Sequence, residues 1–272
     1  MSDTLRLLIL GAHPDDCEYH AGGLSTIYRE HGNDVRVISV TDGGAGHHEK
    51  AGPQLVDIRR AEAAAAAAVI GATSDVWEFP DGQLEPTLAV RERIIREIRT
   101  FKPDIVLTHR LNDYHPDHRA VGQAVQDASY MVTVPAIVPD TPILQRDPVV
   151  AYLPDTFTRP NPMRADIIVD VTPQLETITR MLACHESQVF EWLPFNEGIL
   201  DTVPSDKHER ITWLRSWFEA HSAPRTEFFQ DAIVDKYSED WRDVRFVEVF
   251  EISEYASTLD DATREKLFGF VH

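Results

Sequence analysis

The chain has 272 residues, of which 43% are hydrophobic, so it can bury the core of a large α/β domain. Its 45 acidic and 26 basic residues give a net charge of −19, which repels nucleic-acid phosphates and anionic membrane surfaces. There is no long apolar run of transmembrane type, no secretory signal pattern at the amino terminus, and only two cysteines. We therefore expect a cytoplasmic protein that binds neither nucleic acid nor membrane.

The first half of the chain alternates short apolar runs with segments of helical spacing. Strands are expected at residues 5–10, 35–41, 76–79 and 104–109. Helices are expected at residues 23–31, 53–70, 87–101 and 117–130. Such alternation is typical of a mostly parallel sheet with helices on both faces.

Beyond about residue 133 the pattern becomes irregular and rich in proline. Further strands are expected at residues 149–153, 167–171 and 244–251, and further helices at residues 173–186 and 213–221. We predict one α/β domain over residues 1–272, built on a doubly wound, Rossmann-like sheet. Its core would cover about residues 5–190, and a C-terminal elaboration of about residues 191–272 would shape the pocket.

Two short segments combine imidazole and carboxylate groups directly after expected strands. His13-Pro14-Asp15-Asp16 follows the first strand, and His115-Pro116-Asp117-His118 follows the fourth. Taken alone, each has an ordinary interpretation as a turn or a helix cap. In a parallel sheet, however, ligands bind beyond the carboxyl ends of the strands, where both segments fall. Imidazole and carboxylate together suit Zn²⁺, so the pair of segments predicts a metal site.

The same segments resemble two signatures of the LmbE/PIG-L family of zinc-dependent N-deacetylases. His13-Pro14-Asp15-Asp16 resembles the family's AHPDD motif, and His115-Pro116-Asp117-His118 resembles its HxDH motif. Weaker similarities cover about residues 5–190, namely Arg59-Arg60-Ala61-Glu62, Phe79-Pro80-Asp81-Gly82 and His185-Glu186-Ser187-Gln188. The resemblance implies one Zn²⁺ per chain, bound by His13, Asp16 and His118.

The resemblance also implies roles for five further residues. Asp15 would be the general base, His115 would stabilise the oxyanion, and Asp117 would orient His115 and raise its pKa. Arg59 and Asp81 match positions that contact substrate hydroxyl groups in sugar-acting relatives. The activity implied is hydrolysis of an N-acetyl group from an amino sugar, such as an N-acetylglucosamine derivative, or from a glycoconjugate by metal-activated water.

The chain departs from the family pattern in two places. Cys17 stands where many relatives carry glutamate directly after AHPDD, and the acid follows one place later as Glu18. Asp113 stands where some relatives carry a catalytic tyrosine, so the role of that tyrosine is not transferred to this chain.

Two other functions are consistent with the same residues. A metal-dependent hydratase of an unsaturated di- or tricarboxylic acid would need cations facing the pocket, for which Arg59, Arg110 and Arg119 are candidates. A non-catalytic metal- or sugar-binding module would have no need of a base at Asp15. The aromatic residues after about residue 190 would pack on the core, line the pocket or form the contact of a homo-oligomer.

Overall fold

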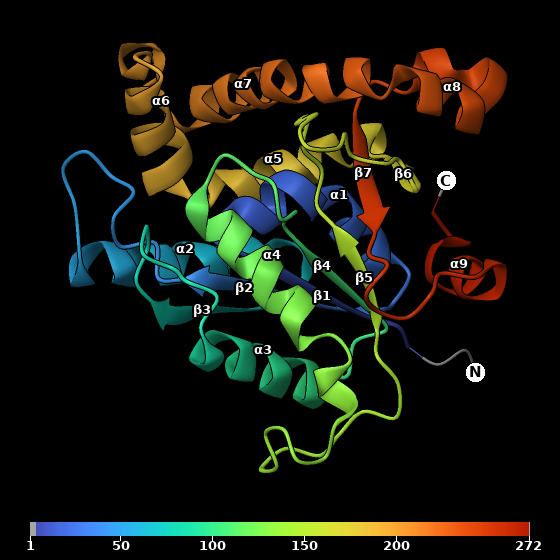
Figure 1. The fold of residues 1–272 in the computed structure, drawn as a ribbon. Helices are drawn as coiled ribbons and strands as arrows, with labels where there is room; N and C mark the ends of the chain where they lie inside the picture. The colour runs from blue at the N-terminus through green and yellow to red at the C-terminus, as the bar shows by residue number, and fades with distance from the viewer. Residues whose placement is uncertain (1–3, 272) are drawn as a thin grey trace.

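The computed structural model describes residues 4–271, whose strands form one seven-stranded sheet (Figure 1). The strand order is β3-β2-β1-β4-β5-β7-β6. The strands are β1 (Arg6–Gly11), β2 (Asp34–Thr41), β3 (Thr73–Phe79), β4 (Ile105–Thr108), β5 (Val149–Tyr152), β6 (Ile167–Asp170) and β7 (Val247–Ile252). The first five strands run parallel, whereas β7 is antiparallel to both β5 and β6. This doubly wound, mostly parallel sheet confirms the predicted fold class.

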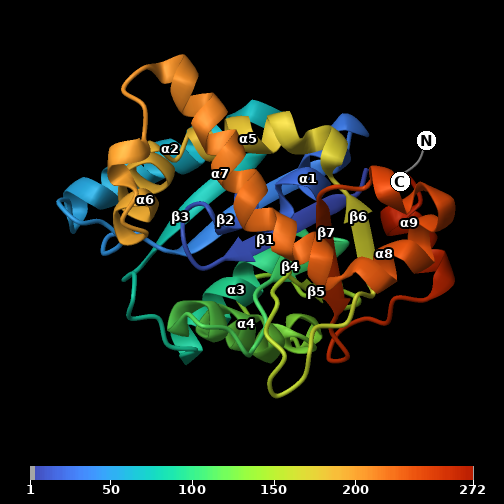
Figure 2. The same cartoon turned by 90° about the horizontal axis from the view of Figure 1, so that it is seen from above.

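Helices cover both faces of the sheet, with α1, α2 and α5 on one side and α3 and α4 on the other (Figure 2). The helices are α1 (Asp16–Glu30), α2 (Pro53–Ile70), α3 (Leu88–Phe101), α4 (Pro116–Ala128), α5 (Leu175–Ala183), α6 (Leu193–Asn196), α7 (Lys207–Phe228), α8 (Gln230–Tyr237) and α9 (Asp261–Phe268). Along β1, Leu7 and Ile9 enter one hydrophobic core, while Leu8 and Leu10 enter the other. The alternation of side chains along a strand thus builds both layers from one apolar run.

Helix α1 begins earlier than expected and bends in its middle. We expected a helix from residue 23, but α1 starts at Asp16 and has non-helical torsion angles at Ala21. The Glu248 carboxylate, on β7, accepts hydrogen bonds from the backbone N–H groups of Gly23 and Leu24 at 2.7 and 2.8 Å. This contact caps the second half of the helix, so the predicted start coincides with the bend. A Cβ atom at Gly23 would lie 2.2 Å from Val171 Cγ1, which explains glycine at this close approach.

The C-terminal region completes the sheet and spans its carboxyl edge. Strand β7 inserts between β5 and β6, and we therefore propose that the chain folds as one domain. Helix α7 is longer than the expected 213–221, because Asp206 caps it by accepting N–H bonds from His208 and Glu209. It crosses the strand ends in Figure 2.

No helix in residues 4–271 has both the length and the hydropathy that crossing a membrane requires. Cys17 and Cys184 are free thiols. The cytoplasmic location stays a prediction.

The capping carboxylate predicts a specific pH dependence of stability. Burial raises the pKa of Glu248 to about 7, compared with an ordinary value of 4.5. The folded state therefore holds this proton more tightly than the unfolded state. The stabilisation from this proton is complete at pH values below the pKa of Glu248 in the unfolded chain. It is lost as the pH rises through the pKa of Glu248 in the folded protein. Between these limits the loss should reach about 3 kcal/mol at most.

Glu248→Gln has no carboxyl group at this position, so its free energy of unfolding should not show this decrease with rising pH. Urea unfolding between pH 4.5 and 8 measures the free energy of unfolding for wild type, Glu248→Gln and the exposed control Glu227→Gln. Wild type and the control should lose stability with rising pH relative to Glu248→Gln. Equal slopes in all three proteins would contradict the assignment.

Candidate active site

The two sequence motifs meet at the carboxyl ends of adjacent strands. β1 pairs with both β2 and β4, and the chain order reverses direction at this point of the sheet. His13 and Asp16 lie between β1 and the first turn of α1, and His118 lies in the first turn of α4. Pro116, at the start of α4, favours helix initiation immediately before His118. The motifs therefore face each other at the crevice where doubly wound folds bind ligands.

The predicted zinc ligands form a compact triangle. His13 Nδ1 lies 3.3 Å from His118 Nε2. The Asp16 carboxylate oxygens lie 3.4 Å from His13 Nδ1 and 3.4 Å from His118 Nε2. Zinc bonds of about 2.0–2.1 Å in tetrahedral geometry place ligand atoms about 3.3 Å apart. The spacing of these three side chains therefore fits a tetrahedral metal ion with one position left open.

The charges around the triangle also suit a cation. Although burial opposes it, the charges of His118 and His109 hold the pKa of Asp16 well below its usual range. Burial likewise opposes protonation of His118, but Asp16 and Asp113 outweigh it and raise the pKa of His118 to about 9. The cluster thus attracts positive charge, which a bound divalent cation would supply in place of protons.

His109, which the sequence analysis did not assign to the site, is part of this cluster. Its Nε2 lies 3.1 Å from the Asp16 carboxylate, and its ring stacks on that of His118 with centroids 3.9 Å apart. Within residues 4–271, three overlapping groups could hold a metal ion. These are His13 with His115 and His118, Asp16 with His109 and His118, and His13 with Asp81 and Asp117. In the sequence, the sign that His109 belongs to the site is its position directly after the strand that becomes β4.

Asp15 combines a strained backbone with an unusual carboxyl group. Its φ of 123° and ψ of −26° lie in a region that residues other than glycine rarely adopt. Burial and the neighbouring Asp16 charge raise the pKa of Asp15 to about 6. Its side chain lines the cavity beside the triangle. Strain of this kind, beside a metal-binding cluster, is typical of a functional position.

Asp117 has different neighbours from those expected. Its carboxylate lies 3.3 Å from His13 Nε2 and accepts N–H bonds from Gly82 and Leu84. We expected this carboxylate to orient His115, but the bonds aim it at His13 instead. It can therefore fix the tautomer of His13 and leave Nδ1 free for a metal.

His115 is next to the triangle without a carboxylate partner among the described residues. Its ring centroid lies 4.4 Å from that of His13 and 5.1 Å from that of His118. Burial and the neighbouring His13 lower the pKa of His115, in contrast to the expected rise. Its Nδ1 accepts the backbone N–H of Asp117 at 3.2 Å, so the neutral ring carries its proton on Nε2.

Arg59 and Asp81 connect the loop after β2 to the site. Asp81 lies 3.3 Å from His13 Nε2 and accepts N–H bonds from Ala45 and Gly46. Arg59 is buried, and its Nη2 donates to the carbonyl oxygen of Gly46. Neither side chain lines the cavity, and their contact with a substrate stays a prediction.

Comparison with known proteins identifies the part of the chain that carries these motifs. Residues 8–129 match the model of the PIG-L family, described as GlcNAc-PI de-N-acetylase. The chain contains a PIG-L domain.

Two curated relatives of this chain have different activities. Diacetylchitobiose deacetylase from Thermococcus kodakarensis is 29% identical over 205 residues, which cover 71% of this chain and 76% of the relative. 4-Oxalmesaconate hydratase from Pseudomonas putida is 26% identical over 218 residues, which cover 77% of this chain and 84% of the relative. The relatives therefore include a deacetylase and a hydratase.

Solved structures show that the whole fold is shared. N,N'-diacetylchitobiose deacetylase from Pyrococcus horikoshii has a TM-score of 0.70 at 22% identity, covering 93% of this chain and 85% of that one. A 4-carboxy-2-hydroxymuconate hydratase from Pseudomonas putida has a TM-score of 0.71 at 20% identity, covering 94% and 99%.

A cavity of about 390 Å³ opens beside the triangle and extends beyond the PIG-L match. Its walls include the segment after β5, residues 153–157, and residues of α6 and α7. Trp217, His221 and Arg225 of α7 line it, and all three lie in the segment predicted to shape the pocket. The C-terminal region thus forms one wall of the site.

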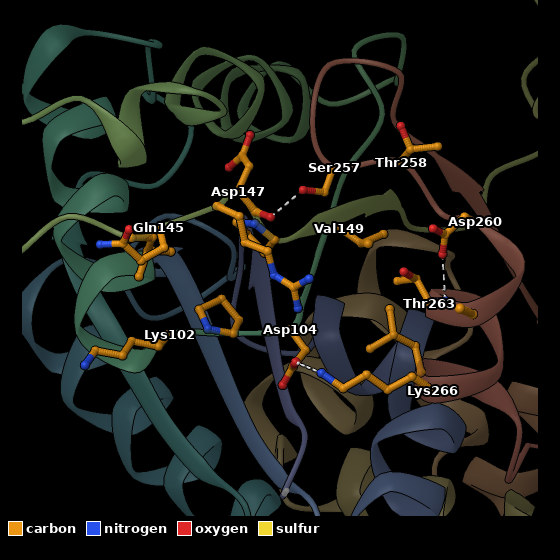
Figure 3. A pocket seen from close by; sticks show the side chains of 16 residues that line it. Lys102, Asp104, Gln145, Asp147, Val149, Ser257, Thr258, Asp260, Thr263 and Lys266 are labelled. Carbon is orange, nitrogen blue, oxygen red and sulfur yellow. Dashed lines mark hydrogen bonds and ion pairs between the residues drawn. The ribbon is translucent and has the colours of Figure 1, made fainter.

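A second cavity of about 550 Å³ lies at the opposite edge of the sheet, before β4 and β5 (Figure 3). In it, Lys266 pairs with Asp104 at 2.6 Å, and Ser257 donates to the carbonyl oxygen of Asp147. It contains no residue of the two PIG-L motifs. The candidate active site is therefore the cavity beside the triangle, at the carboxyl edge.

The strain at Asp15 predicts that stability and function oppose each other. Asp15→Gly removes both the unfavourable torsion angles and a partly buried carboxyl group, so it should stabilise the fold by about 1 kcal/mol. Asp15→Asn retains the strain and serves as the matched control. Chemical denaturation of the three metal-free proteins tests this, and a glycine variant less stable than wild type would refute the strain argument.

Proposed function

We propose that the protein is a zinc-dependent hydrolase that removes an N-acetyl group from an amino sugar or glycoconjugate. The observation that carries this proposal is the triangle of His13, Asp16 and His118, with spacing that fits a tetrahedral ion. The deacetylases among the relatives support the reaction. A non-catalytic binding module would not need the strained Asp15 beside this cluster.

In this proposal His13, Asp16 and His118 hold the ion, and Asp117 and Asp81 hold His13 in place. A bound zinc ion supplies Lewis-acid chemistry that polarises an acyl oxygen and acidifies water. The Asp15 carboxylate accepts the proton of the attacking water and then passes it to the departing amine nitrogen. The attack forms the carbon–oxygen bond, and collapse breaks the carbon–nitrogen bond.

His115 acts in this scheme as a neutral hydrogen-bond donor. Its Nδ1 is occupied by the Asp117 N–H, so Nε2–H is available to the oxyanion that develops on the acyl carbon. The sequence led us to expect a raised pKa for His115, but a neutral ring can also donate this hydrogen bond.

A hydratase is the second candidate, because one relative is 4-oxalmesaconate hydratase. The three arginines expected to serve it have other partners, and among the described residues the cavity-lining arginine without an ion pair is Arg225. Arg110 pairs with Asp155 at 2.9 Å and with Glu251 at 3.3 Å. Arg59 donates to a backbone carbonyl, as does Arg119.

Metal content and acetate release test the proposed function together. Wild type should bind one zinc ion per chain and release acetate from N-acetylated sugars. His118→Ala should lose metal affinity by at least about tenfold, whereas the exposed control His208→Ala should keep it. Asp15→Asn should retain zinc but lose acetate release by about 100-fold or more.

Mass spectrometry of bound metal and an enzymatic acetate assay give the two readouts. Wild type without bound zinc, or Asp15→Asn with unchanged acetate release, would overturn the proposed mechanism.

A further inference from the structure

Arg225, on α7, is a buried cation on the cavity wall. Only 8% of the residue is exposed, and it lines the same cavity as Asp15 and His118. Its hydrogen bonds are long, with 3.4 Å from Nη1 to the Val247 carbonyl oxygen and 3.5 Å from Nη2 to His20 Nδ1. A guanidinium group has five N–H donors, so most of the donor capacity of Arg225 has no protein acceptor.

Apart from Asp15, the charged groups that line the cavity with Arg225 have partners. Arg110 forms ion pairs with Asp155 and Glu251. Glu197 accepts the Trp217 indole N–H at 3.0 Å and lies 3.2 Å from His221 Nε2.

Asp113 lies 3.1 Å from His118 Nδ1. Arg225, by contrast, makes no ion pair with a carboxylate in the described part of the chain. The nearby Glu248 uses its two oxygens for the N–H groups of Gly23 and Leu24.

The position of Arg225 relative to the triangle suits a substrate group remote from the reacting bond. His20 is close to both Arg225 and His109: its Nδ1 lies 3.5 Å from Arg225 Nη2, and its ring centroid lies 6.1 Å from that of His109. His109 in turn contacts Asp16. A small molecule whose amide lies at Asp15 could therefore extend along His20 to the guanidinium group.

Burying a guanidinium group without an anion costs free energy, and a carboxylate can accept two parallel N–H bonds from it. Although several acidic side chains also line the cavity, an arginine without an ion pair locally favours an anionic ligand group over a neutral one. We propose that Arg225 binds a carboxylate of the substrate, so that the substrate class is N-acylated molecules that carry a carboxylate. This inference rests on the proposed function of the same cavity.

A matched pair of substrates tests the inference. N-acetylglucosamine and N-acetylglucosaminuronic acid differ only at C6, which is a hydroxymethyl group in the first and a carboxylate in the second. Wild type should hydrolyse the acid with a kcat/KM about tenfold or more above that of the neutral sugar. Arg225→Gln should lose this preference, Arg225→Lys should keep part of it, and Arg215→Gln, an exposed change on the same helix, should keep all of it. A wild-type preference for the neutral sugar, or a preference unchanged in Arg225→Gln, would overturn the inference.

A binding measurement separates this inference from the proposed reaction. Calorimetric titration of the zinc-loaded proteins with glutarate, a simple dicarboxylate, requires no turnover. Wild type and Arg215→Gln should bind glutarate about tenfold or more tightly than Arg225→Gln does. If neither sugar releases acetate, the deacetylase proposal fails, but loss of glutarate binding in Arg225→Gln would still support the carboxylate site. Equal glutarate affinity in all variants would refute it.

Discussion

The contacts of the Asp16 carboxylate hold the site together. One of its oxygens accepts the backbone N–H groups of Ala12 and His13 at 2.9 and 2.7 Å, and the carboxylate also contacts His109 and His118. It thereby joins the end of β1 and the start of α1 to the end of β4 and the start of α4. Only 8% of the Asp16 residue is exposed, so its charge depends on these partners. A metal ion bound between the same groups would compensate the charge most directly.

Much of the fold could be predicted from sequence because its signals are local. The expected helix at 53–70 matches α2, ended by Gly71 in the left-handed conformation, and Thr87 caps α3 as a local signal suggests. The six histidine and aspartate residues of the two motifs were predicted to meet because the ends of parallel strands lie at one edge. The structure brings them together at the β1–β4 junction.

The rest depended on contacts between residues far apart in the sequence. The bend in α1 requires Glu248, which lies 225 residues from Gly23. The pairing of Asp117 with His13 spans 104 residues, so HxDH spacing alone could not reveal it. The sequence predicted that residues 191–272 shape the pocket, but it did not predict which residues of α7 line it. Neither an aromatic pattern nor a single arginine indicates the direction of a side chain. Arg225 is informative only once its lack of a carboxylate partner is seen in three dimensions.

The most direct test of the metal centre is a crystal structure of the zinc-loaded protein, with anomalous diffraction measured at the zinc edge. The geometry predicts one peak within about 2.0–2.2 Å of His13 Nδ1, a carboxylate oxygen of Asp16 and His118 Nε2. A peak between His13, Asp81 and Asp117, or one coordinated by His109 in place of His13, would contradict the central claim.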